Sequence, residues 1–122
     1  MKIKVVKRIT ATIVEFSTNV GIGIGTCDNN EFREGEYYAE LDIDQILEIG
    51  KNIKIVHEKN CFIRHSDHEN EIQGIIDGVD EDGLFYLQLS IDCLIMIESA
   101  NDCFKEGDSL LLTVNANSLR IT

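Results

Sequence analysis

The feature that most constrains this chain is its wealth of β-branched residues. Isoleucine, valine and threonine account for 18, 7 and 6 of the 122 residues, whereas alanine occurs four times and proline is absent. β-Branched side chains lose rotamer freedom in a helix and pack well on the pleated surface of a sheet. The composition therefore favours strands over helices along the whole chain.

Apolar and polar residues alternate along several segments, which is typical of strands with one buried face. The first of these segments runs from Lys2 to Ile13 and predicts one long strand with a bulge near Lys7. The other predicted strands are residues 20–26, 36–43, 52–56, 61–64, 71–79, 84–91, 93–98, 110–114 and 118–121.

The segments between these strands are rich in glycine, asparagine and aspartate, as tight turns require. Asp82-Gly83 is the clearest hairpin signal, and residues 44–49 fit a helical turn and a continued strand equally well. We therefore predict an all-β protein with at most one or two short helical turns. Its antiparallel sheet is expected to form a small barrel or a sandwich, as a single domain over residues 1–122.

The charge of the chain restricts its partners. Twenty-two acidic residues against eleven basic ones give a net charge of −11. Such a protein repels nucleic acid and anionic membranes, and its natural complement is a cationic partner. The longest run of Leu, Ile, Val, Met and Phe residues is four, at 94–97, and no signal-peptide core follows the basic first residues. We expect a cytoplasmic protein that contacts neither nucleic acid nor membrane.

The densest acidic segment lies around residues 36–44. Between residues 28 and 48, eight acidic residues, including Asp28 and Glu31, stand against Arg33 alone. Strand alternation turns one set of these side chains outward. The predicted outward residues are Glu36, Tyr38, Glu40, Asp42 and Asp44. We interpret this acidic face as a binding surface for a basic partner, with the tyrosine as an apolar anchor. A solvated face that keeps the sheet soluble is the alternative.

The beginning of the chain departs from this charge balance. Lys2, Lys4, Lys7 and Arg8 give +4 over the first eight residues, whereas the remainder holds 7 bases and 22 acids. If this strand lies beside the acidic segment, cross-strand pairing relieves the repulsion between the acids. The alternative is a separate basic patch that contacts a partner or a second copy.

Only the segment around the three histidines is a candidate for metal binding. His57, Cys61, His65, Asp67 and His68 fall within twelve residues. Their spacing matches no zinc pattern, and residues 66–70 have the composition of a solvated hairpin loop. We predict that loop, and a metal site remains the alternative. The four cysteines form no C-x-x-C pair, which favours free, buried thiols over disulfides. They are Cys27, Cys61, Cys93 and Cys103.

No other segment indicates chemistry. A phosphate-binding loop is followed by a helix, and no helix is predicted after Gly21, Gly23 and Gly25. Their spacing instead predicts a strand that another backbone or a bulky side chain approaches closely. No serine occupies a G-x-S-x-G elbow. We therefore expect no enzymatic activity, no catalytic residue and no cofactor.

Two short stretches resemble known families. Residues 35–43, followed by 50–53, resemble the small acidic immunity proteins encoded beside bacterial polymorphic and contact-dependent inhibition toxins. That resemblance implies a protein that binds one cognate toxin domain, often a nuclease, and blocks it. Residues 105–110 and 119–121 look like the closing strands of OB-like or TOBE barrels, which implies a barrel.

The sequence thus leads to two functional hypotheses. The first is an immunity protein that neutralises a cognate basic toxin through the acidic face. The second is a small-ligand-binding or metal-binding β-barrel that uses the histidine segment or a cavity beneath the glycine-rich strand.

Overall fold

The computed structural model describes residues 1–27, 33–101 and 103–122. Over these ranges it contains strands and no helix, so the prediction of an all-β protein is confirmed. The strands are β1 (Lys2–Arg8), β2 (Ile13–Thr18), β3 (Gly21–Cys27), β4 (Gly35–Tyr38), β5 (Leu41–Ile43), β6 (Ile46–Leu47), β7 (Ile53–Val56), β8 (Phe62–Ser66), β9 (Glu69–Val79), β10 (Phe85–Ser90), β11 (Cys93–Ser99), β12 (Ser109–Asn115) and β13 (Leu119–Ile121). None of the described residues forms a helix that could cross a membrane.

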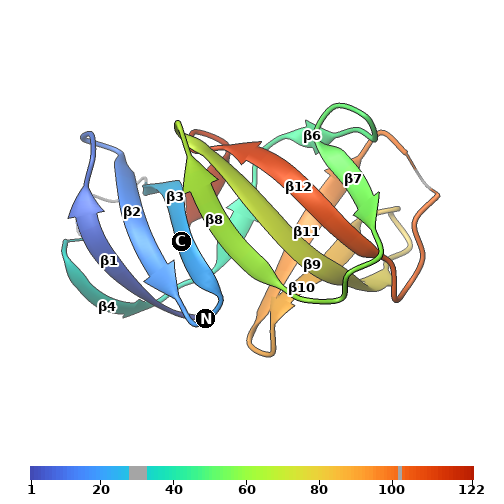
Figure 1. The fold of residues 1–122 in the computed structure, drawn as a ribbon, viewed down its shortest axis with the longest axis horizontal. Coiled ribbons are helices and arrows are strands. Elements are labelled where there is room, and N and C mark those ends of the chain that lie inside the picture. The colour runs from blue at the N-terminus through green and yellow to red at the C-terminus, as the bar shows by residue number, and fades with distance from the viewer. Residues whose placement is uncertain (28–32, 102) are drawn as a thin grey trace.

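The strands belong to one large sheet of mixed direction. Its main path runs β4-β1-β2-β3-β8-β9-β10-β11-β6, while β12 joins β9 to β7 and β13 joins β3 to β5. Most neighbours are antiparallel, but β3 runs parallel to both β8 and β13, and β6 runs parallel to β11. Figure 1 shows β1–β4 on one side of the molecule and β8–β12 on the other.

The sheet is not closed into a barrel, in contrast to one form of the prediction. Its pairing explains why. The edge of β3 that faces away from β2 is divided between β8, at Gly21, and β13, at Thr26 and Cys27. β9 likewise pairs with β12 along one edge and with β8 and then β10 along the other. Because these strands each have three partners, the sheet branches instead of following one ring.

The predicted first strand is two strands joined by a turn. Residues 9–12 form that turn, and the Thr10 hydroxyl oxygen accepts hydrogen bonds from the backbone N–H groups of Thr12 and Ile13. Threonine side chains that bond to the backbone in this way favour turns over strands. The bulge near Lys7 is confirmed, because the pairing of β1 with β2 shifts register between Val5 and Lys7.

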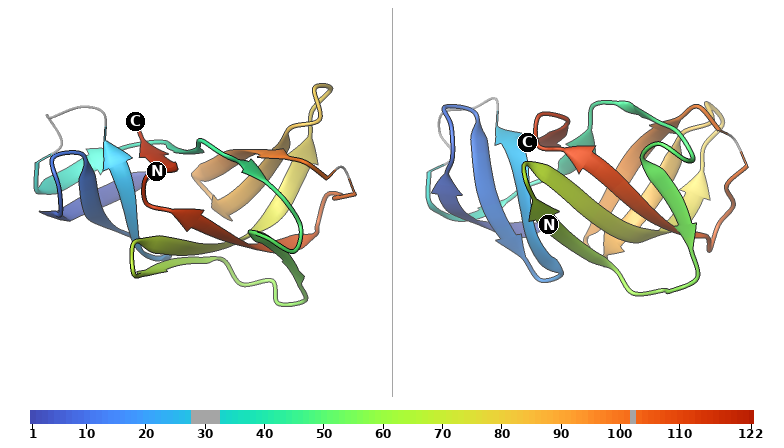
Figure 2. Two further views of the ribbon diagram at one scale, coloured as in Figure 1. Left: turned by 90° about the horizontal axis from the view of Figure 1, so that it is seen from above. Right: turned by 45° about the horizontal axis from the view of Figure 1, so that its top comes forward.

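The predicted strand 36–43 is also divided. Ala39 and Glu40 interrupt it, and the chain changes partners there: β4 pairs with β1, whereas β5 pairs with β13. The Ala39 N–H donates to the Met1 carbonyl, and Glu40 exchanges two backbone hydrogen bonds with Thr122. The first and last residues of the chain therefore lie close together, as the N and C marks in Figure 2 also show.

The structure also tests the predictions for two shorter segments, residues 44–49 and the Asp82-Gly83 hairpin. Residues 46–47 form strand β6 and Ile49 bridges to Ile53, so the strand is correct for this segment and the helical turn is not. The Asp82-Gly83 hairpin is confirmed, with Gly83 at a φ of +79°. In this hairpin the backbone N–H of Leu84 donates to the Asp80 carboxylate, and this hydrogen bond is the main reason why the pKa of Asp80 lies below its ordinary value.

The core is mostly aliphatic and continuous across the sheet. Phe16, Ile72, Leu87 and Ile95 are among its fully buried side chains. Three polar residues are also buried, namely Asn70, Gln73 and Ser109, and each has a hydrogen-bonding partner. The position of Asn70 contradicts the prediction of a solvated loop at 66–70. The turn consists of Asp67 and His68 alone, both at positive φ, and β9 begins at Glu69.

A short junction connects the part of the sheet that contains β1–β4 to the part that contains β8–β12. Gly21 of β3 pairs with Ile63 of β8, and the Ile63 N–H donates to the Val20 carbonyl at 3.1 Å. Beside this pair, the side-chain amide of Asn70 reaches Ile24 of β3 and accepts from its N–H at 2.8 Å while donating to its carbonyl at 2.7 Å. A second donation, at 3.2 Å, goes to Val114 of β12. One side chain therefore ties β3, β9 and β12 together.

Candidate functional site

The alternation predicted for the acidic segment is correct. Ala39 and Leu41 are buried, and Tyr37 and Ile43 are half-buried. On the other face Glu36, Tyr38, Glu40 and Asp44 are exposed and Asp42 is half-buried. Tyr38 is 84% exposed on the edge strand β4, which leaves its ring without a core to pack against. Asp28 and Glu31 lie outside the described residues.

Both ends of the acidic face are partly neutralised by neighbouring strands. Lys2 of β1 forms an ion pair with Glu36 at 3.2 Å, and Arg120 of β13 reaches Asp44 at 3.4 Å. Among the described residues, Glu40 and Asp42 form no salt bridge. The free negative charge of this face is therefore concentrated at its centre.

The predicted place of the basic first strand beside the acidic segment is confirmed for Lys2 and Lys4. β1 pairs with β4, so that Lys4 lies opposite Glu36 and Lys2 lies opposite Tyr38. Arg8 lies beyond this pairing and donates to the Ala11 carbonyl in the turn. Cross-strand compensation of charge is thus possible at the β4 end of the acidic face.

We expect Lys2→Gln to have a small effect on stability. The Lys2 and Glu36 side chains are 57% and 63% exposed, so water and salt screen their attraction. The substitution should lower the free energy of unfolding by about 0.2–1 kcal/mol at low salt. The loss should shrink in 1 M NaCl, where the Debye length is only about 3 Å. Urea unfolding at both salt concentrations measures this, with Lys7→Gln as the control, and a loss independent of salt contradicts the assigned ion pair.

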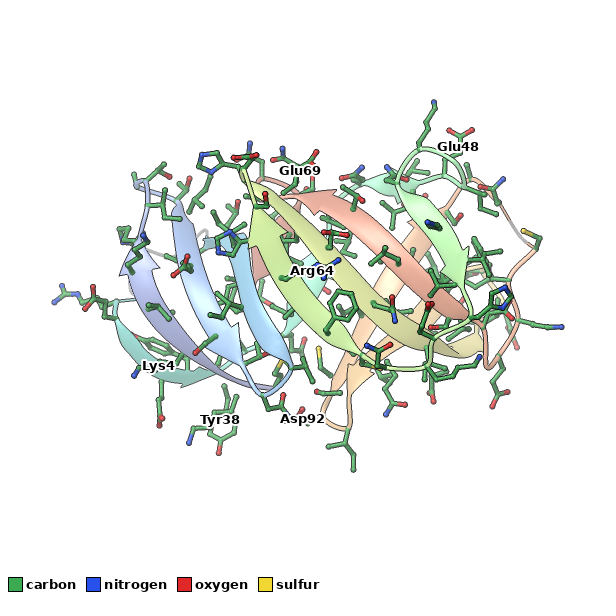
Figure 3. All side chains as sticks on the ribbon, in the orientation of Figure 1. Lys4, Tyr38, Glu48, Arg64, Glu69 and Asp92 are labelled. Atoms are coloured by element: carbon green, nitrogen blue, oxygen red, sulfur yellow. The ribbon has the colours of Figure 1, made fainter. Side chains whose placement is uncertain are left out.

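A hollow of about 520 Å³ opens beside the centre of the acidic face. Glu40 and Asp42 line one side, and the hairpin formed by β10 and β11 lines the other with Ile91, Asp92 and Leu94. Figure 3 shows the labelled Tyr38 and Asp92 side chains at the same edge of the molecule. The carboxylates of Glu40, Asp42 and Asp92 around this hollow thus come from two segments that are far apart in the sequence.

The hairpin presents an apolar surface that the sequence prediction missed. Ile91, at its tip, is 94% exposed, and Leu94 and Met96 are 51% and 44% exposed. The prediction placed Ile91 at the end of a strand, but only Ile91 and Asp92 separate β10 from β11. Two residues between adjacent strands must form the turn, which is the signal that indicates exposure here. An isoleucine at such a position is not explained by the turn itself.

The pKa of the Cys93 thiol reflects the burial and the charges at the base of this hollow. Burial raises the pKa of Cys93 to about 11; the positive charge of the Met1 amino group opposes this increase, and the negative charges of Asp92, Asp42 and Glu40 add to it. Burial also raises the pKa of the Cys27 and Cys61 thiols. All four cysteines are free, as predicted, but burial is confirmed only for Cys27 and Cys93, since Cys61 is half-buried and Cys103 is exposed.

The histidines do not come together. His65 of β8 lies 2.9 Å from the Glu15 carboxylate of β2, whereas His57 and His68 are exposed. Among the described residues, no three His, Cys, Asp or Glu side chains are placed to hold a metal ion. The described part of the structure therefore gives the metal-binding hypothesis no support.

The glycine-rich strand is closely packed, as predicted. A Cβ atom on Gly23 would lie 2.6 Å from the Ile63 side chain, and one on Gly25 would lie 2.9 Å from the Leu119 carbonyl oxygen. The space beneath this strand is thus occupied by the neighbouring strands, which removes the basis for the predicted ligand cavity there.

Comparison of the chain with family models, with curated proteins and with solved structures gave no match. The function must therefore be inferred from the surface of the molecule.

Proposed function

We propose that this protein is an immunity protein, which binds a cognate basic toxin domain and neutralises it through the acidic face. The observation that carries this proposal is an 84% exposed tyrosine on the same face as Glu40 and Asp42, whose carboxylates form no salt bridge with any described residue. Negative charge accelerates the encounter with a basic protein, and an exposed aromatic ring supplies the apolar contact that slows dissociation.

The proposal assigns separate roles to the residues of the face. Glu40 and Asp42 steer the partner, because neither charge is compensated by a salt bridge among the described residues. Tyr38 inserts its ring into the partner's surface. Glu36 and Asp44 contribute less, since Lys2 and Arg120 already offset their charges. Binding by this route needs no catalytic group, which agrees with the expectation that the protein is not an enzyme.

The experiment that tests the proposal uses the reading frame next to the gene. The C-terminal domain encoded there, which the proposal expects to be toxic, is produced with and without this protein, and bacterial growth is measured. Growth is expected only when both are present, and the purified proteins are expected to form a complex. If the protein neither restores growth nor binds the purified toxin domain, the proposal is wrong.

Variants of the face should then separate steering from anchoring. Glu40→Lys combined with Asp42→Lys should lower the association rate constant by about tenfold or more at low salt, because steering is lost. Tyr38→Ala should mainly raise the dissociation rate constant, by about thirtyfold if the tyrosine contributes ~2 kcal/mol. Surface plasmon resonance at two salt concentrations measures both constants. Glu58→Lys combined with Glu106→Lys makes the same charge change at exposed loop positions and is the matched control. An equal effect of the control pair would contradict the assigned face.

A further inference from the structure

We propose that the hollow beside Glu40 and Asp42 continues into a trough that docks one extended segment of the partner, in which basic and apolar side chains alternate. This inference deepens the proposed function and rests on it for the identity of the protein that carries the segment. It adds the β10–β11 hairpin to the binding surface, together with a sequence pattern for the partner.

The trough consists of two hollows that adjoin. A second hollow, of about 430 Å³, shares Asp42 and Met96 with the first. It continues along β5 and β11 to Asp44 and Glu98. The two strands lie side by side here, although β5 pairs only with β13 among the described strands. The trough is therefore long enough to follow several residues of each strand.

The charges along the trough select a cationic occupant. Its carboxylates are those of Glu40, Asp42, Asp44, Asp92 and Glu98. Its cationic groups are the Arg120 guanidinium and the Met1 amino group, which donates to the Ala39 carbonyl at 3.1 Å. That guanidinium is engaged by Asp44 at 3.4 Å. Of the residues that the structure describes, no lysine lines either hollow. Arginine or lysine side chains of a partner would thus meet carboxylates along the whole length.

The apolar side chains add the second requirement. Leu94 and Met96 are two residues apart on one face of β11, and the tip residue Ile91 lies beyond them. Alternate residues of a strand are about 6.8 Å apart, so a second strand laid along β11 matches this spacing with every other side chain. The intervening side chains of such a segment point the opposite way, toward Glu40 and Asp42. This geometry favours alternation of basic and apolar residues.

Three synthetic peptides of eight residues test the inference with the full-length protein. The first alternates arginine and leucine, the second alternates arginine and serine, and the third joins four arginines to four leucines. We expect isothermal titration calorimetry to show that the first binds at least about tenfold more tightly than either of the others. Amide chemical shifts should change at residues 39–44 and 91–98.

Two double variants decide whether the hairpin is responsible. Leu94→Ser with Met96→Ser should reduce the affinity for the arginine–leucine peptide to that for the arginine–serine peptide. Ile22→Ser with Ile55→Ser is the matched control, because those residues are 47% and 50% exposed elsewhere on the sheet. Circular dichroism melts establish that both variants fold. Equal affinity for the three peptides, an equal loss in the control, or shift changes outside the trough would overturn the inference.

These results are distinguishable from a failure of the proposed function. Selective binding of the alternating peptide without rescue from the toxin would leave the docking trough and remove the immunity function. Rescue from the toxin with no peptide selectivity would leave the immunity function and remove the docking trough.

Discussion

Asn70→Asp is expected to destabilise the protein strongly, although it replaces one atom. The Asn70 amide nitrogen donates to the carbonyl oxygens of Ile24 and Val114, and a carboxylate cannot donate to either. Each buried carbonyl that loses its donor costs about 1–3 kcal/mol, so the free energy of unfolding should fall by about 2–6 kcal/mol. Asn70 itself has no exposed surface, so the new charge would also be desolvated.

The pH dependence of this loss provides a further check. Burial raises the pKa of a carboxyl group above its unfolded value, so the destabilisation is present at neutral pH. It should diminish as the pH falls through the raised pKa, because the protonated form is neutral and regains one donor. Urea unfolding at pH 5 and pH 8 measures the difference.

Asn117→Asp is the matched control for Asn70→Asp. Asn117 is exposed in the turn before β13, where a carboxylate stays hydrated. Its substitution should change the free energy of unfolding by no more than about 0.5 kcal/mol. Similar losses for the two variants would contradict the role assigned to Asn70 at the junction of the sheet.

Local pattern was sufficient to predict most strands and the direction of their side chains. The alternation around Tyr38 specified which residues face outward, and the excess of lysine in β1 indicated the strand beside it. Both inferences use only the two-residue period of a strand and the attraction of unlike charges. They depend little on how the distant parts of the chain are arranged.

The features that sequence reasoning missed depend on tertiary pairing. The interruption at Ala39 and Glu40 arises because β4 and β5 pair with opposite ends of the chain, which no local pattern specifies. Asn70 resembles a loop residue, since Asp67 and His68 precede it, and only the approach of β3 gives it buried partners. The hollow likewise needs β5 and β11 to lie together.

Glycines at the same junction lead to the second large effect. Gly21→Ala should lower the free energy of unfolding by about 2–6 kcal/mol, which sums backbone strain of about 1–3 kcal/mol and overpacking of about 1–3 kcal/mol. Gly21 has a φ of +141°, a conformation that an L side chain rarely adopts. A Cβ atom there would lie 1.8 Å from the Ile63 carbonyl oxygen, which belongs to the backbone of β8. The clash cannot be relieved without moving the strand that connects the two parts of the sheet.

Three other glycines separate these two contributions. Gly35 has nearly the same φ, +139°, and no described residue lies within 4 Å of where its Cβ would be, so Gly35→Ala should cost only the strain. Gly74 has an ordinary φ, but its Cβ would lie 2.7 Å from the Gln88 carbonyl oxygen, so Gly74→Ala should cost only the overpacking. Gly78 has neither feature, and Gly78→Ala should be neutral or stabilising by up to about 1 kcal/mol.

Chemical denaturation of the four alanine variants compares them on one scale. If strain and clash act independently at Gly21, its loss should approach the sum of the losses at Gly35 and Gly74, because Gly35→Ala measures the strain alone and Gly74→Ala the clash alone. A loss for Gly21→Ala no larger than that for Gly35→Ala would mean that β8 shifts freely away from β3. That outcome would contradict a rigid junction and would leave Asn70 as the principal connection between the two parts of the sheet.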